Sequence, residues 1–182
     1  GGDGSFLDLA VLLEEMGRAL LPSPFFSTVV LGGLTILEVG TESQKRQFLT
    51  PIANGDMILT LALAESTGGY DAAEIAVEAV KKEGKYMLRG TKLFVPDASV
   101  ADWILCAART KKGHNPEEGI TVFMIESGTH GLACSLLPSL SKDKQCEVVF
   151  NDAKAMALGN PDHGWPEVAK LVQRAAVAKS VE

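Results

Sequence analysis

The sequence predicts an α+β protein, with a helical segment followed by an antiparallel β-barrel or sandwich and then the start of another helix. Up to residue 56, apolar residues recur at the three- and four-residue spacing of a helix face. From residue 57 they recur in short runs of strand-forming residues with glycine-containing turns between them. Helical spacing returns near the end. We therefore divide the chain into units 1–56, 57–160 and 161–182.

The first unit carries explicit helix start and stop signals. Ser5 with Asp8, and Thr41 with Gln44, fit the capping pattern in which two side chains satisfy free amides at a helix start. Gly55 fits a helix end. The expected helices are 5–20, 27–39 and 41–55.

The middle unit contains short runs that are typical of strands. No helix long enough to cross between parallel strands lies among them, so we expect antiparallel pairing. The runs are "MILTLALAE", "EIAVEAVKK", "KYMLRGTKLFV", "DWILCAART", "GITVFMIE", "GLACSLLP" and "QCEVVFND".

The last unit predicts a helix with Pro166 in its first turn. An apolar stripe follows it, and two interpretations of that stripe stay open. Either it enters a helical domain that lies beyond residue 182, or it docks on the β domain. The stripe consists of Val168, Leu171, Val172, Ala175 and Ala176.

Composition limits the function classes. Hydrophobic residues make up 46% of the chain and charged residues 22%, which is ordinary for a globular protein. A net charge of −6 argues against a nucleic-acid partner, because phosphate backbones select basic surfaces. No apolar run approaches the roughly 18 residues of a membrane span, and no signal peptide is recognisable at the start.

Cysteine and histidine spacing argues against disulfide and metal sites. Cys106, Cys134 and Cys146 are odd in number and far apart, so we expect reduced thiols in a cytoplasmic protein. The histidines are scattered, so we expect no metal site.

The stretch "LALAESTGGYDAAEI" raises a functional question. It lacks the glycine spacing of a dinucleotide fingerprint and the Gly-Lys-Ser/Thr of a phosphate-binding loop. A tight turn between strands is the simplest interpretation. The alternative is a small anion-binding nest formed by the N–H groups of residues 68–71.

The order of segments resembles that of an acyl-CoA dehydrogenase. "TESQKRQFLTPIANGDMILTLALAESTGGYDAAEI" is similar to the family's helix, turn and first signature, commonly Ala-Leu-Thr-Glu-Pro-x-x-Gly-Ser-Asp. "GKYMLRGTKLFVPDASVADWILCAART" resembles the region that is typically Gly-x-Lys-x-Trp-Ile-Thr-Asn. "GITVFMIESGTHGL" and "GNPDHGWPEV" also fit, so the resemblance covers nearly the whole chain in one colinear order.

The resemblance implies an FAD enzyme that oxidises an acyl-CoA thioester to the trans-2-enoyl-CoA. In this family a glutamate removes the α-proton while the β-hydride passes to flavin N5. The family's glutamate lies in the C-terminal helical domain, so we expect the isolated chain to lack the base and to be inactive. The implied partners are acyl-CoA, an electron-transfer flavoprotein or similar acceptor, and further subunits in a homo- or hetero-oligomer.

Several family positions are changed in this sequence. The signature threonine falls at Ala64, the serine that contacts the FAD phosphate at Tyr70, and the threonine near flavin N5 at Pro96. The tryptophan beside the flavin falls at Phe94, which keeps an aromatic ring. The implied cofactor-binding residues are Leu63, Ala64, Gly69, Tyr70, Phe94, Val95 and Pro96.

These changes support an alternative function. Without the threonine hydroxyl groups at Ala64 and Pro96, and with Tyr70 in place of the serine, the chain would hold FAD weakly or not at all. It would then be a catalytically incomplete partner subunit of an acyl-CoA dehydrogenase-like assembly. A generic acyl-binding β module is less attractive because of the long helical flanks.

Overall fold

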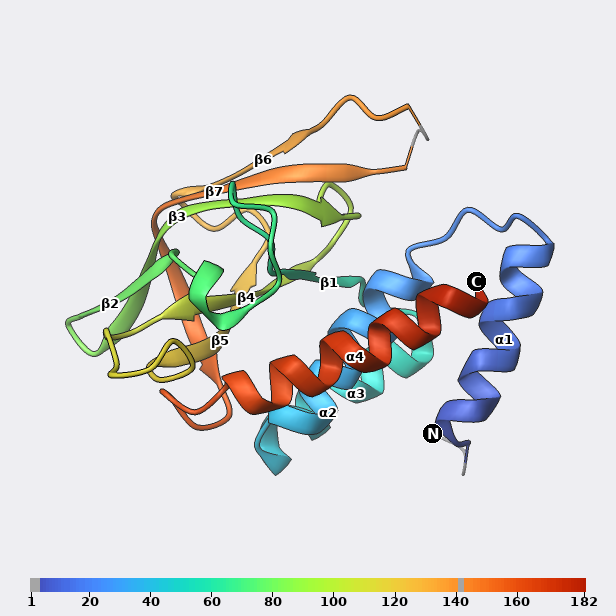
Figure 1. Ribbon diagram of the computed structural model, residues 1–182, viewed down its shortest axis with the longest axis horizontal. Coiled ribbons are helices and arrows are strands. Elements are labelled where there is room, and N and C mark those ends of the chain that lie inside the picture. The colour runs from blue at the N-terminus through green and yellow to red at the C-terminus, as the bar shows by residue number, and fades with distance from the viewer. Residues whose placement is uncertain (1–3, 141–142) are drawn as a thin grey trace.

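A layer of helices packs against a ring of strands in the computed structural model, which describes residues 4–140 and 143–182 (Figure 1). The first three residues of the expected unit 1–56 lie outside that description. The helices are α1 Phe6–Arg18, η1 Phe26–Gly33, α2 Leu34–Val39, α3 Glu42–Asn54, η2 Ala72–Glu74 and α4 Trp165–Val181. The strands are β1 Leu59–Ala62, β2 Glu78–Lys82, β3 Lys85–Pro96, β4 Trp103–Arg109, β5 Ile120–Glu126, β6 Leu132–Leu136 and β7 Gln145–Leu158.

Both predicted capping boxes are present. The Ser5 side chain accepts from the Asp8 amide, and the Asp8 carboxylate accepts from the Ser5 amide at 2.6 Å. Thr41 and Gln44 make the same reciprocal pair at the start of α3. Gly55 ends α3 with φ of 79°, a left-handed conformation that glycine adopts without steric cost.

The predicted helix 27–39 is not one regular α-helix. Its first part, η1, is a π-helix, and only α2 has α geometry. The change of winding falls in a segment containing Gly32 and Gly33, which favour an α-helix less than other residues do. Gly32 also lies close to β1. A Cβ at this position would be 2.7 Å from the Leu59 Cβ, so only glycine fits without a shift.

The ring runs β4–β2–β3–β7–β5, and β5 pairs back to β4. β1 adds to β4, and β6 pairs with β7. The expectation of purely antiparallel pairing was wrong, because β1 and β2 both lie parallel to β4. No crossover helix is needed, since the β2–β3 hairpin itself spans the connection from β1 to β4. Only Glu78 and Arg109 join β2 to β4, so the ring is not an evenly closed barrel.

β4 separates two hydrophobic cores. Its side chains alternate, so Ile104 and Cys106 lie in the core within the ring, while Leu105 and Ala107 face the core shared with the helices. Burial on both faces explains why "WILCAAR" is a nearly continuous apolar run. The second core fixes the helical layer relative to the strands.

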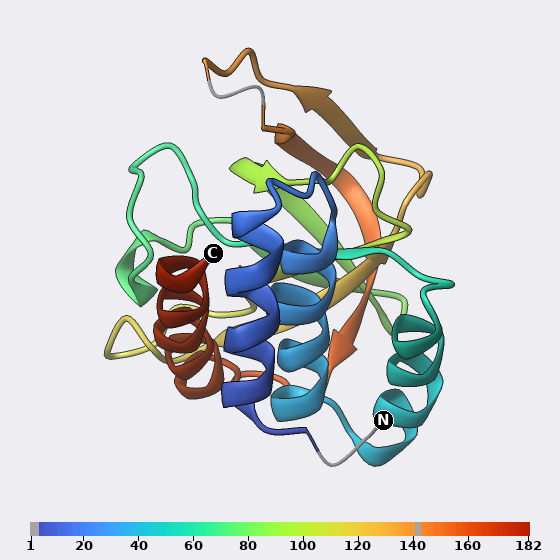
Figure 2. The same cartoon turned by 90° about the vertical axis from the view of Figure 1, so that its right-hand side faces the viewer.

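Val168, Leu171 and Ala175 of the stripe are buried, and α4 lies beside α1 (Figure 2), whereas Val172 is half-buried and Ala176 is exposed. Val168 and Leu171 join the core between helices and sheet, while Ala175 packs with Leu13 of α1. Lys170 and Arg174, which both lie on α4, form ion pairs with Glu38 of α2. The stripe thus packs on this chain's own helices and sheet, and its entry into a further helical domain stays a prediction.

Candidate functional site

A cleft of about 700 Å³ opens between the helical layer and the edge of the ring. The chain just after β1 forms one wall and the end of β3 forms another. Helix η1 and the outer part of α4 close the helical side. Residues that line the cleft include Phe26, Ser27, Leu31, Leu61, Leu63, Ala64, Tyr70, Leu93, Phe94, Pro96, Asp97, Leu171, Val172, Ala175 and Ala176.

The Gly-Gly stretch is a turn that leads into η2. The Gly68 N–H donates to the Glu65 carbonyl at 3.0 Å, so this one amide of the proposed nest is already paired. Gly68 has φ of 79°, which explains a glycine there. Gly69 is needed for another reason, because a Cβ would lie 2.7 Å from the Glu74 Cγ.

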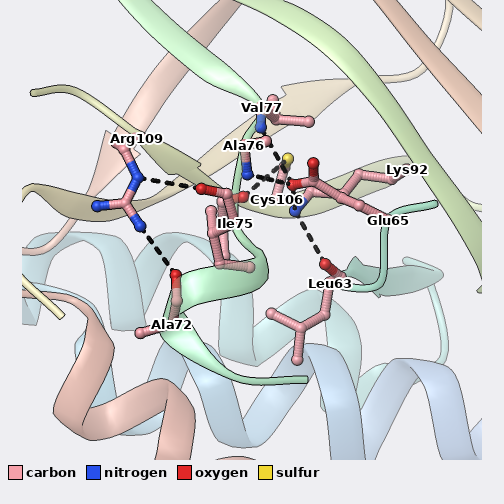
Figure 3. A network of polar contacts seen from close by, with 10 residues as sticks. Leu63, Glu65, Ala72, Ile75, Ala76, Val77, Lys92, Cys106 and Arg109 are labelled. Carbon is pink, nitrogen blue, oxygen red and sulfur yellow. Dashed lines mark hydrogen bonds and ion pairs between the residues drawn. The ribbon is translucent and has the colours of Figure 1, made fainter. Parts of the chain in front are cut away.

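A buried ion pair holds the base of this loop (Figure 3). The Lys92 side chain is 0% exposed, and its Nζ donates to Glu65 Oε1 at 2.7 Å. The same carboxylate oxygen accepts from the Ala76 and Val77 amides at 3.0 and 3.1 Å. These two amides therefore bind a side chain rather than a neighbouring strand, which is why β2 starts only at Glu78 and not at Glu74 as "EIAVEAVKK" indicated.

Arg109 supports the loop from its other side (Figure 3). Its guanidinium donates to the carbonyls of Ile75 at 3.0 Å and Ala72 at 2.8 Å. It also donates to the carbonyls of Glu118 and Pro116. The loop that carries Tyr70 is thus fixed at its base by Glu65 and along η2 by Arg109.

Cys106 lies beside the ion pair but is chemically quiet. Burial raises the pKa of its thiol to about 12, although nearby Lys92 opposes that increase. A neutral thiol is a poor nucleophile at physiological pH. The cysteine therefore serves as a small apolar residue in the ring.

Phe94 presents its ring to the cleft from a strained backbone. Its φ is 54°, a region that bulky L-residues seldom occupy, and the residue is 53% exposed. It lies between Lys92 and Val95, where the register of β3 against β7 shifts. Bulges of this kind redirect side chains, and here the bulge places an aromatic ring on the cleft wall.

The predicted cofactor-binding residues divide into two groups. Leu63, Ala64, Tyr70, Phe94 and Pro96 line the cleft together. Gly69 and Val95 are not among its lining residues: Gly69 packs under Glu74, and Val95 is buried in the core of the ring.

The Ala64 amide is an unsatisfied donor at the cleft among the residues that the structure describes. Ala64 is almost fully buried, and its N–H donates to no residue that the structure describes, whereas its carbonyl accepts from the Leu93 amide at 2.9 Å. Buried amides rarely remain unpaired, so this one marks a place for an acceptor atom. A flavin ring offers carbonyl oxygens and ring nitrogens as acceptors and a flat face for Phe94. The residues present therefore fit FAD through backbone and aromatic contacts, without the hydroxyl groups missing at Ala64 and Pro96.

Sequence reasoning missed four polar residues at or near the cleft. Ser27 Oγ lies 2.6 Å from Asp97 Oδ2, which ties η1 to the end of β3. Thr60 Oγ1 donates to the Pro96 carbonyl at 2.6 Å. Lys92 was visible as the lysine of "GTKLFV", but a single lysine in a strand normally indicates a solvated face.

Two features are absent from the part of the chain that the structure describes. Within 4–140 and 143–182, no helix is both long and apolar enough to cross a bilayer. Over the same residues, no group of three or more histidine, cysteine or acidic side chains is placed to hold a metal ion.

Residues 60–153 match the model of the acyl-CoA dehydrogenase middle domain, and residues 1–56 match that of the acyl-CoA dehydrogenase N-terminal domain. The chain belongs to the acyl-CoA dehydrogenase family. Mitochondrial isovaleryl-CoA dehydrogenase of Pongo abelii is 31% identical over 90% of this chain and 41% of its own length. The short-chain-specific acyl-CoA dehydrogenase of Megasphaera elsdenii is 31% identical over 89% of this chain and 44% of its own length.

Solved structures of the family share the fold. Butyryl-CoA dehydrogenase from Megasphaera elsdenii gives a TM-score of 0.87 at 28% identity, covering 98% of this chain and 49% of that one. A chain of the ChsE4–ChsE5 complex from Mycobacterium tuberculosis gives 0.82 at 25% identity, covering 94% and 45%. A chain in the structure of an electron transferring flavoprotein of Acidaminococcus fermentans gives 0.84 at 26% identity, covering 97% and 47%. The chain thus spans about half the length of the relatives it matches. The predicted family and α+β fold class are confirmed.

Proposed function

We propose that this chain forms part of an FAD-dependent acyl-CoA dehydrogenase that converts an acyl-CoA thioester to the trans-2-enoyl-CoA. The observation that carries this proposal is the cleft between the helices and the ring, where the unpaired Ala64 amide and the exposed Phe94 ring lie on neighbouring walls. In this proposal residues 1–56, 57–160 and 161–182 belong to an N-terminal, a middle and a C-terminal domain.

The residues of this chain bind and orient. FAD, when bound, supplies the acceptor for the β-hydride of the thioester. The amides of Leu63 and Ala64 would donate to the bound flavin, and Phe94 would offer it an aromatic contact. Gly69 and Tyr70 contribute to the FAD site from the loop. Val95 and Pro96 contribute to it by shaping the backbone at the end of β3. Apolar residues of η1 and α4 exclude water from the acyl chain.

We assign the catalytic base to residues beyond this chain. Asp97 is the carboxylate nearest the end of β3, and it is already paired with Ser27. The position of the base in the C-terminal helical domain of the family that this chain resembles supports this assignment. The isolated chain is accordingly proposed to be inactive.

The partners follow from the family. We propose acyl-CoA as substrate, an electron-transfer flavoprotein or a similar protein as the electron acceptor, and assembly as a homo- or hetero-oligomer. We also propose a cytoplasmic location, because the three free cysteines suit a reducing compartment.

The test compares residues 1–182 with the full-length protein in an acyl-CoA oxidation assay with an artificial electron acceptor. We expect turnover from the full-length protein, with FAD bound, and none from residues 1–182. Turnover by residues 1–182 alone would show that the base lies within them. No turnover from a flavin-loaded full-length protein with any of a series of acyl-CoA substrates would contradict the proposed reaction.

A second candidate function rests on the missing hydroxyl groups at Ala64 and Pro96. In that case the chain belongs to a partner subunit of a mixed assembly that holds FAD weakly or not at all. The similar chain from the ChsE4–ChsE5 complex comes from an assembly of two named proteins. The visible spectrum of the purified full-length protein separates the two functions, since a folded but colourless protein favours the partner subunit.

A further inference from the structure

Lys92 is buried in a way that apolar packing does not explain. It is among the largest fully buried side chains of the chain, and its ammonium contacts Glu65 Oε1 and the Leu63 carbonyl. Replacing a buried ion pair by apolar residues is often neutral or stabilising, so such a pair is weak evidence for stability alone. Stability alone therefore does not explain why the ammonium is buried here, and its contacts are the remaining explanation.

One of these contacts leads directly to the cleft. Lys92 Nζ donates to the Leu63 carbonyl at 2.9 Å (Figure 3). That carbonyl and the Ala64 N–H belong to one planar peptide group and point in opposite directions. A charged donor on the oxygen polarises the peptide, which makes its N–H a stronger donor. Ala64 lines the cleft, and its N–H has no partner among the described residues.

Glu65 makes this arrangement possible. Its Oε1 compensates the charge of Lys92 and is itself held by the Ala76 and Val77 amides. The ammonium is therefore fixed from one side by a carboxylate that cannot turn away easily, and it meets the Leu63 carbonyl on the other.

We propose that Lys92, held by Glu65, is a positioning residue that polarises the Leu63–Ala64 peptide and so strengthens the Ala64 N–H as a donor to an acceptor atom of the flavin ring. The inference rests on the proposed FAD site. It adds a role for a buried pair that touches neither substrate nor cofactor.

The test uses the double variant E65Q/K92M in the full-length protein. The glutamine side chain that replaces Glu65 keeps an acceptor oxygen for Ala76 and Val77, while the ammonium on the Leu63 carbonyl is lost. If this variant does not fold, E65Q/K92Q, which keeps polar atoms at both positions, replaces it. Two quantities are measured: the FAD dissociation constant by flavin fluorescence, and the amide resonance of Ala64 by NMR in the protein without FAD. The control is L88A, a cavity-forming change on the same strand that touches none of these groups.

We expect the double variant to bind FAD about fivefold more weakly, the effect of weakening one hydrogen bond to the ligand. The Ala64 amide resonances should move upfield, whereas L88A, even if less stable, should change neither quantity. An unchanged amide resonance, an unchanged dissociation constant, or an equal loss of affinity in L88A would each overturn the proposal. If the wild-type protein binds no FAD, the proposed function fails, and the amide resonance alone then decides whether Lys92 polarises this peptide.

Discussion

Replacing Phe94 by glycine separates stability from ligand binding. The left-handed backbone of Phe94 costs about 1–2 kcal/mol, which glycine would recover. Two effects lower the free energy of unfolding. The greater freedom of glycine in the unfolded chain costs about 0.4–1 kcal/mol. The lost burial of the half-exposed ring costs about 1 kcal/mol. We therefore expect the free energy of unfolding to change by less than about 1 kcal/mol.

The same substitution should weaken FAD binding about tenfold, since an aromatic contact with the ring is lost. Urea unfolding and flavin fluorescence titration measure the two effects. Phe123→Ala is the matched control, because Phe123 is fully buried within the ring of strands. Its substitution should lower the free energy of unfolding by about 3–5 kcal/mol. Destabilisation of Phe94→Gly by more than about 2 kcal/mol, or unchanged FAD affinity, would refute the assignment of Phe94 to the ligand rather than to the core.

Three further predictions concern the scaffold. Gly32→Ala should destabilise by about 1–3 kcal/mol in urea unfolding through overpacking on β1, whereas Gly33→Ala, with only ordinary contacts, should be neutral or slightly stabilising. Hydrogen bonding from Lys111 lowers the pKa of Asp162, so its stabilisation is present above the usual pKa of 3.8 and is lost as pH falls through the lower folded value. Urea midpoints should therefore differ between wild type and Asp162→Asn at pH 7 and converge as the pH falls from 3.8 through the lowered folded pKa, and a constant difference would contradict this. Cys106 should react with iodoacetamide only after denaturation, as mass spectrometry of the labelled protein can show.

Local structure was predictable from the sequence wherever contacts between neighbouring residues determine it. The caps at Ser5 and Thr41 and the left-handed Gly55 depend on contacts within one turn, and all were predicted. The parallel pairing of β1 with β4 was not predictable in this way. It joins Leu59 to Trp103, and short apolar runs do not specify the direction of such a distant partner.

The candidate site shows the same division. The family resemblance brought attention to Ala64 and Phe94, and the structure shows both on the cleft. It gave no sign that Phe94 has a positive φ, because that strain arises from a bulge between two strands. Nor did it indicate that Lys92 reaches the Leu63 carbonyl, since this contact spans 29 positions and depends on the fold of the ring.

The pairing of α1 with α4 has a consequence for the time course of folding. Leu13 of α1 is buried partly by Ala175 and Ala178, which leave the ribosome only after every strand of the ring. The ring lies between these helices in the sequence, and its pairings are mostly long-range, which makes its formation slow. During synthesis the apolar face of α1 therefore stays partly uncovered until α4 has been made, because residues near η1 cover only part of it. We expect nascent chains that stop before α4 to be the species most prone to aggregate or to bind chaperones.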